Sequence, residues 1–172
     1  GEMMNMIKFI RASKNKYKKL REMGIKLGEN CEIYDNVSWG SEPYMISIGN
    51  HVRITNGVRF ITHDGGVWVL RAMEDSFKDV DSFGAINIGD NTHIGMNTII
   101  MPNVTIGKNC IIGCGAVVTK DIPDNSVAVG VPARVIEDIQ TYIDKNRHKF
   151  VNTKHMSYEE KKMYIEKNIL KH

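Results

Sequence analysis

The chain has 172 residues, of which 42% are hydrophobic and 25% are charged, and it carries a formal net charge of +3. This length and composition are typical of one globular domain that needs no metal or disulfide for stability. The charge is too small, and no suitable motif is present, to indicate a nucleic-acid partner. No apolar run is long enough to cross a membrane. The odd number of cysteines and the absence of a secretory signal predict a cytoplasmic protein.

Residues 1–24 are predicted to form a basic helical segment. Ile7, Ile10, Tyr17 and Leu20 recur at the spacing of a helical apolar stripe. The same segment is crowded with basic residues: Lys8, Arg11, Lys14, Lys16, Lys18, Lys19 and Arg21. A solvated helix face accounts for this pattern. The alternative is peripheral contact with an anionic membrane surface or a lipid-linked substrate.

A six-residue repeat organises the chain from Leu27 onward. Aliphatic or aromatic residues recur every six positions, first at Leu27, Ile33 and Trp39, then at Ile48, Ile54 and Phe60, and then at Ile88, Ile94, Ile100, Ile106, Ile112 and Val118. Four positions after most of them stands a small or β-branched residue, including Cys31 and Cys110. This period fits neither a helix nor a half-buried strand. Each hexad is therefore predicted to form a short strand and a corner of a parallel β-solenoid.

Two breaks in the register predict loops that leave the coil, over residues 41–47 and 64–85. Insertions in a solenoid project from one face and often build the binding site. Trp39 occupies an aliphatic slot, which favours packing over a role in sugar binding. Cys31 and Cys110 fall in small interior slots and are predicted to pack in the core.

The chain ends with a predicted helical segment over residues 136–172. Tyr158 to Leu170 has the composition of a helix, and Ser157 followed by Glu160 is typical of a capping box at its start.

The repeat over Leu27–Pro123 and the segment Gly130-Val131-Pro132-Ala133-Arg134 resemble the hexapeptide-repeat acyltransferases, in particular maltose, galactoside and capsular-polysaccharide O-acetyltransferases. The resemblance implies an all-β solenoid, a left-handed parallel β-helix over residues 25–135, with a C-terminal capping helix. It also implies a homotrimer with active sites between adjacent subunits, and acetyl-CoA as the acyl donor.

The segment Phe60-Ile61-Thr62-His63-Asp64-Gly65-Gly66, at the start of the longer loop, resembles the catalytic corner of sugar O-acetyltransferases. Transfer of an acetyl group to a hydroxyl needs a base near neutral pH, and histidine suits this role. His63 is therefore the candidate general base, and the alternative is a structural turn histidine. The resemblance places an oxyanion-binding backbone N–H at Gly95-Met96.

Four further residues are candidates for contact with the acceptor. Glu42, in the shorter loop, is a candidate to orient His63 or to bind the acceptor, and its alternative role is to shape the turn at Pro43. Asp64 and Trp68 belong to the longer loop. His93 is a candidate to line the cofactor or acceptor channel.

The segment Ile112–Pro123, with Gly130–Arg134, resembles the acetyl-CoA-binding end of the family. Cys114 and Ala116 are small enough to admit a pantetheine arm, Thr119 belongs to the same motif, and Lys120 and Arg134 offer positive charge to CoA phosphates. The alternative is that the segment is only the last turn and cap of the coil. Glu137 replaces a second basic residue found in some relatives.

Other functions remain open at this point. The closest alternative is N-acetylation of an amino sugar or modification of an antibiotic. A gamma-type carbonic anhydrase shares the coil, but its three zinc ligands would have to come from His51, His63 and His93, which are widely spaced. No metal is therefore expected. A non-catalytic scaffold would need neither distinctive motif.

Overall fold

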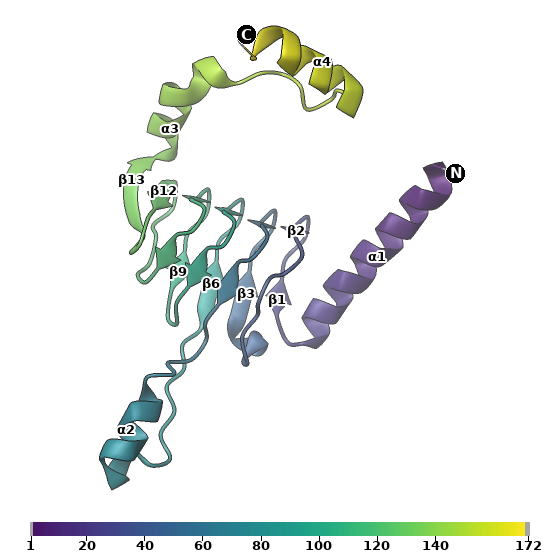
Figure 1. The fold of residues 1–172 in the computed structure, drawn as a ribbon. Coiled ribbons are helices and arrows are strands. Elements are labelled where there is room, and N and C mark those ends of the chain that lie inside the picture. Colours follow the sequence, from purple (N-terminus) through teal and green to yellow (C-terminus); the bar gives the residue numbers. More distant parts are fainter. Residues whose placement is uncertain (1, 171–172) are drawn as a thin grey trace.

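The computed structural model describes residues 2–170, and the side chains of residues 3, 4 and 14–170. Short parallel strands stack into a coil with three flat faces, a helix flanks the first turn, and an arm projects from one corner (Figure 1). The sequence predicted this parallel β-solenoid, and the structure confirms it.

Three sheets form the faces of the coil. Face A contains β1 (Lys26–Leu27), β3 (Ile46–Ile48), β6 (Ile86–Ile88) and β9 (Thr105–Ile106). Face B contains β2 (Glu32–Ile33), β4 (Arg53–Ile54), β7 (His93–Ile94), β10 (Ile111–Ile112), β12 (Ser126–Val129) and β13 (Arg134–Asp138). Face C contains β5 (Arg59–Phe60), β8 (Ile99–Ile100) and β11 (Val117–Val118). The corners between consecutive faces are named AB, BC and CA.

Equivalent hexad positions stack directly above one another. Ile88 pairs with Ile48 in the preceding turn and with Ile106 in the following turn. All named strand pairs are parallel except β12 with β13, which is antiparallel. Because the side chains of the repeat point inward at every turn, the core is one continuous column of aliphatic residues.

The packing roles predicted for the large and small interior residues are confirmed. The Trp39 ring is buried and stacks on Phe60, with 4.9 Å between ring centroids and 7° between ring planes. Cys31 and Cys110 are buried in the core, whereas Cys114 is exposed. Trp39 therefore fills the first turn of the coil, and its ring is not available to a sugar.

The corners use asparagine and glycine for different purposes. Asparagines such as Asn91 adopt the left-handed conformation, with φ of 52° at that residue. Gly89, by contrast, has no positive φ, but a Cβ at this position would lie 2.6 Å from the Lys108 nitrogen of the next turn. Glycine after the aliphatic residue is therefore required for the close approach of successive turns.

The arm confirms the longer predicted loop, residues 64–85, and contains structure that the register did not predict. It carries α2 (Val67–Met73) and η2 (Asp75–Phe77), which extend away from the coil (Figure 1). The shorter insertion contains η1 (Pro43–Met45) and ends two residues earlier than predicted. Ile46 is fully buried and starts β3, so residues 46 and 47 belong to face A and not to the loop.

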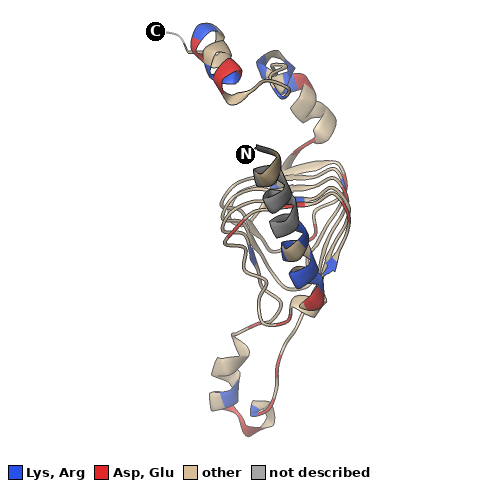
Figure 2. Cartoon of the chain, turned by 90° about the vertical axis from the view of Figure 1, so that its right-hand side faces the viewer, with Lys and Arg blue, Asp and Glu red and all other residues tan. Residues whose placement is uncertain are grey.

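The C-terminal end of helix α1 (Glu2–Glu22) packs against β1 of the first turn, and the rest of the helix extends away from the coil (Figure 1). Leu20 is buried in the core, and the Tyr17 hydroxyl donates a 2.6 Å hydrogen bond to the Cys31 carbonyl. Basic residues lie along the last turns of α1 (Figure 2). The side chains of Ile7, Lys8, Ile10 and Arg11, which belong to the predicted stripe and basic face, lie outside the described residues. Within residues 2–170, no helix is long and apolar enough to span a membrane.

The C-terminal end differs from the predicted capping helix. Strand β13 pairs with β12, and α3 (Ile139–Asn146) packs against both strands. After η3 (Arg147–Lys149), α4 (Tyr158–Asn168) lies apart from the coil (Figures 1 and 2). Its predicted capping box is confirmed, because Ser157 and Glu160 exchange both hydrogen bonds. Strand β13, and not α4, pairs with the free edge of β12. Helix α4 therefore does not cap the coil within one chain.

Candidate active site

A three-residue cluster surrounds the candidate base at the CA corner. Glu42 Oε2 lies 3.1 Å from His63 Nδ1, and the Thr62 hydroxyl donates a 2.6 Å hydrogen bond to the same oxygen. The side chain of His63 is 43% exposed, whereas that of Glu42 is only 14% exposed. The carboxylate thus supports the imidazole from inside and leaves its other edge open to a substrate.

The base of the arm fixes the backbone around His63. His63 forms an antiparallel bridge with Phe83, the Asp64 N–H donates to the Ser82 carbonyl at 2.8 Å, and the Gly84 N–H donates to the Thr62 carbonyl at 2.8 Å. The two chain segments that enter and leave the arm are therefore joined at the histidine. This pairing orients His63 although it lies beside a long insertion.

A glycine in the preceding turn allows Glu42 to reach this cluster. Gly40 has a φ of +67°, and a Cβ at this position would lie 3.1 Å from the Thr62 hydroxyl oxygen. Larger residues are disfavoured both by the conformation and by the space. Pro43 then starts η1, so the chain turns immediately after Glu42.

The electrostatics of the cluster define the tautomer of His63. Hydrogen bonds from Thr62 first, and then from His63, hold the pKa of Glu42 below its usual value. An ionised carboxylate only accepts hydrogen bonds, so the Nδ1 of His63 must carry the proton of this contact. In the neutral ring, Nε2 is then the unprotonated nitrogen. The arrangement can therefore accept a proton at Nε2 and stabilise the resulting imidazolium.

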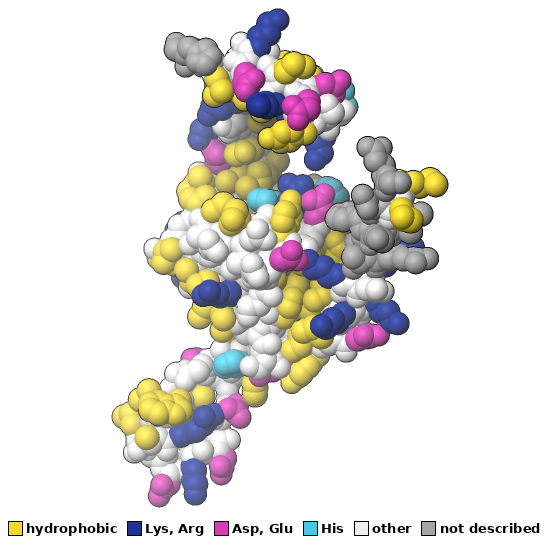
Figure 3. Space-filling view, turned by 45° about the vertical axis from the view of Figure 1, so that its right-hand side comes forward, with side chains coloured by type: hydrophobic (Ala, Val, Ile, Leu, Met, Phe, Trp, Pro, Cys, Tyr) yellow, Lys and Arg dark blue, Asp and Glu magenta, His cyan; other side chains and the backbone are white. Residues whose placement is uncertain are grey.

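The other predicted acceptor residues are not all near His63. The Asp64 carboxylate accepts a 2.8 Å hydrogen bond from the Gly66 N–H and so shapes the turn into the arm. Trp68, on α2, is 72% exposed, and Val69, Leu70 and Met73 of the same helix are exposed as well. Figure 3 shows apolar side chains gathered on the arm. His93 points outward from face B and is not on the corner of His63. The structure therefore does not bring His93 to the candidate base within one chain.

The residues predicted to bind acetyl-CoA divide between two corners. Gly95 and Met96 lie at the BC corner between β7 and β8, and Cys114 lies one turn further on the same corner. The two turns are linked by a 2.7 Å hydrogen bond from the Gly115 N–H to the Met96 carbonyl. The side chain of Ala116 is fully buried in the interior slot, so in this chain only its backbone can lie against a cofactor.

Thr119 and Lys120 follow β11 and reach the CA corner, on the same corner as His63 but two turns further along. Two strand spacings amount to about 10 Å along the coil axis. Arg134 begins β13 beside the BC corner, where the Ala133 N–H donates to the Val117 carbonyl at 2.8 Å. The two corners are opposite edges of face C, so one chain holds the candidate base and the candidate oxyanion amide at different edges.

Sequence reasoning missed Thr62 and Gly40. Thr62 is fully buried, and a buried hydroxyl beside a candidate catalytic histidine needs a hydrogen-bond partner. The need of the Thr62 hydroxyl for a hydrogen-bond partner could have indicated its role from the sequence, and Glu42 is that partner. Among the described residues, no three His, Cys, Asp or Glu side chains are grouped so that they could hold a metal ion.

The chain is a parallel β-solenoid with a histidine–carboxylate pair at one corner, and comparisons with known proteins assign it to a family of transferases. Residues 85–120 match the family model described as bacterial transferase hexapeptide (six repeats). The chain is 48% identical to Protein CapG of Staphylococcus aureus over 149 residues, covering 86% of this chain and 85% of that protein. It is 36% identical to galactoside O-acetyltransferase of Escherichia coli (strain K12), over 75% of this chain and 70% of that protein.

A solved maltose O-acetyltransferase from Clostridium difficile 630 superposes with a TM-score of 0.57 and 30% identity, over 73% of this chain and 75% of that one. The chain therefore belongs to the hexapeptide-repeat acetyltransferase family, and it is an acyltransferase. The family and its solved structures imply that the parallel coil is a left-handed β-helix.

Proposed function

We propose that the protein transfers an acetyl group from acetyl-CoA to a hydroxyl of a sugar or a polysaccharide precursor, with His63 as the general base. The observation that carries the proposal is the Glu42–His63 pair at the root of the arm. The galactoside and maltose O-acetyltransferases among the relatives support a carbohydrate hydroxyl as the acceptor. Release of CoA thiol from acetyl-CoA, measured against a panel of glycosides and amino sugars, tests the choice of hydroxyl over amine.

The chemistry follows from the tautomer of His63. Nε2 removes the proton of the acceptor hydroxyl while the oxygen forms a bond to the thioester carbonyl carbon. The tetrahedral intermediate collapses by breaking the carbon–sulfur bond, and the imidazolium returns the proton to the departing thiolate. The Glu42 carboxylate stabilises the imidazolium between these two transfers.

The Met96 N–H is the amide best suited to the developing oxyanion. The neighbouring Gly95 N–H already donates a 2.9 Å hydrogen bond to the Ile112 carbonyl. The Met96 N–H has no backbone hydrogen-bond partner within the part of the chain that the structure describes. It lies on the exposed BC corner, where the thioester of a bound cofactor can approach.

A homotrimer completes this site. Ile99 and Val117 are half-buried on the outer side of face C, whereas the outer side of face A carries the polar residues Lys26, Ser47, Asn87 and Thr105. Three chains that turn face C toward a three-fold axis bring the CA corner of one chain against the BC corner of the next. His63 of one subunit then meets Met96 of its neighbour, which the single chain keeps apart.

Lys120→Ala and Arg134→Ala are expected to raise the KM for acetyl-CoA by about 10-fold each, with a smaller effect on kcat. Each change removes a charged contact made equally in the ground and transition states, which is the signature of uniform binding. Steady-state thiol release at varied acetyl-CoA checks this. Lys108→Ala, a change of an exposed lysine on the AB corner, is the matched control. Unchanged KM values in both variants would remove the cofactor assignment of this end.

Glu42→Gln is expected to lower kcat by at least about 10-fold. Hydrogen bonds from Thr62 and His63 lower the pKa of Glu42, so its carboxylate is ionised in the neutral range and stabilises the imidazolium that forms during transfer. The uncharged amide can still accept the hydrogen bond, but it removes this counter-ion. Thiol release at saturating substrate measures the effect, and a Glu42→Gln variant with wild-type kcat would show that the charge of Glu42 does not assist the transfer.

A further inference from the structure

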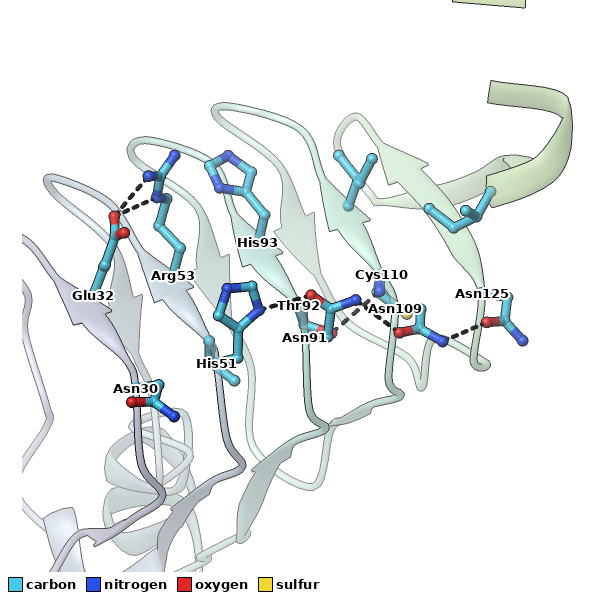
Figure 4. A pocket seen from close by; sticks show the side chains of 13 residues that line it. Asn30, Glu32, His51, Arg53, Asn91, Thr92, His93, Asn109, Cys110 and Asn125 are labelled. Carbon is cyan, nitrogen blue, oxygen red and sulfur yellow. Dashed lines mark hydrogen bonds and ion pairs between the residues drawn. The ribbon is translucent and has the colours of Figure 1, made fainter. Parts of the chain in front are cut away.

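A long groove runs along face B and the AB corner, outside the site described above. It has a volume of about 560 Å³ and spans five successive turns of the coil. Figure 4 shows two rows of side chains on its walls. Asn30, His51, Asn91, Asn109 and Asn125 follow the AB corner, and Glu32, Arg53, His93 and Ile111 follow the outer side of face B.

From His51 to Asn125 the corner row is a continuous ladder of hydrogen bonds. The Nδ1–H of His51 donates to the Asn91 Oδ1 at 2.8 Å, the Asn91 amide donates to Asn109 at 2.9 Å, and the Asn109 amide donates to Asn125 at 2.8 Å. Each amide nitrogen uses one N–H in this ladder and retains a second N–H. The ladder therefore fixes the orientation of a row of polar groups that can still donate to a ligand.

The charged side chains of the face B row neutralise each other, so this row presents polar groups without a net charge. Arg53 Nη2 lies 2.6 Å from Glu32 Oε2, and its Nε donates to the same carboxylate at 2.8 Å. Burial first, and then the Arg53 charge, lower the pKa of His93, which favours its neutral ring. Neither ring nitrogen of His93 has a partner among the described residues. The described residues that line the groove thus offer donors and acceptors but no unpaired cation that would attract a phosphate.

The geometry of the groove selects a long ligand. Its polar groups repeat once per turn, at the spacing between neighbouring strands of about 4.8 Å, so the five turns span about 19 Å. This repeat is close to the length of one pyranose residue in an extended chain. Hydroxyl groups both donate and accept hydrogen bonds, as amide and imidazole groups do.

We propose that this groove binds an extended, uncharged oligosaccharide segment, as a site separate from the acetyl-transfer centre. The inference rests on the proposed function for the choice of a carbohydrate, because a polymeric acceptor would need to be held at more than one place. The AB corner lies opposite face C on the three-sided coil. The groove therefore remains open in the proposed trimer.

The test uses the complete chain and an array of neutral oligosaccharides of two to eight residues, printed beside acidic counterparts of equal length. Affinity is expected to rise with chain length up to the length of the groove and then to level off. The double variant Asn91→Gly and Asn109→Gly should lower the affinity for long neutral chains by about 10-fold. Glycine accepts the positive φ at both positions, so the amides are lost without backbone strain.

Asn36→Gly is the matched control, because Asn36 has the same left-handed conformation, with φ of 58°, and is exposed at the BC corner. No binding of neutral chains, a preference for acidic chains, affinity independent of length, or an equal loss in Asn36→Gly would each overturn the proposal. His63→Ala separates the two proposals, since it should bind long chains and fail to transfer acetyl. Retained transfer in His63→Ala would overturn the base assignment, whereas the binding series tests the groove.

Discussion

His63→Ala should lose acetyl transfer by about 10²- to 10⁴-fold, the contribution typical of a positioned general base. The variant removes the only ring that contacts the Glu42 carboxylate among the described side chains. Because the His63 side chain is nearly half exposed, its loss leaves no cavity in the core, and the fold should be retained. Thiol release at saturating acetyl-CoA measures the effect, and calorimetric titration with CoA should give an affinity close to that of the wild type.

His51→Ala and His93→Ala are the controls for this loss. Both residues line the groove on face B and the AB corner, away from the CA corner. Each should keep near-normal transfer to a small glycoside. A His63→Ala variant with near-normal activity on a verified acceptor would contradict the mechanism, even with the fold and cofactor binding unchanged.

Ile99→Glu should dissociate the trimer and reduce transfer by about 100-fold or more. Ile99 lies on the outer side of β8 at the centre of face C, between Arg59 and Val117. When three copies meet, a carboxylate at this position would be buried, and the cost of its desolvation can exceed the gain from pairing with the neighbouring Arg59. The site would then lose either its base or its oxyanion amide, and misplacement of one group costs about 100-fold in rate.

Sedimentation and thiol release check this prediction together, with circular dichroism as the test of the fold. Thr105→Glu, an equivalent change on the exposed side of face A, should remain trimeric and active. A monomeric wild type that transfers acetyl at full rate, or an Ile99→Glu monomer with normal activity, would show that one chain is sufficient.

The repeat predicted the coil because its information is local and periodic. Residues such as Ile94 and Ile112 stand one full turn apart in the sequence, and each is fully buried in the same column. The same six-residue register predicts that Met96 and Cys114 lie at the same corner of the coil, and the structure confirms this. The limits of the arm were also predictable, since its ends interrupt the register.

The relation between His63 and Met96 was not predictable, because the arm lies between them and breaks the count of corners. Within the arm, the apolar residues of α2 have no partner in the chain that would create a buried pattern, so no period marked that helix. The pairing of Glu42 with His63 was one of three roles that the sequence left open for Glu42. Gly40 and the buried hydroxyl of Thr62 decide between them through space and hydrogen bonding.

The C-terminal helix shows a different limit. Ser157 and Glu160 define where α4 begins because a capping box depends on neighbouring residues alone. The position of α4 relative to the coil depends instead on which segment forms hydrogen bonds with the free edge of β12. Strand β13 occupies that edge, and the apolar side chains of Met163 and Ile169 remain exposed.

The pH dependence of kcat/KM for thiol release, measured on the wild type and on His63→Ala with the same acceptor, decides whether His63 is the general base. The wild-type value should rise with pH as a single base loses its proton, and the residual activity of His63→Ala should lack this inflection. The same inflection in both proteins would show that a group other than His63 accepts the proton.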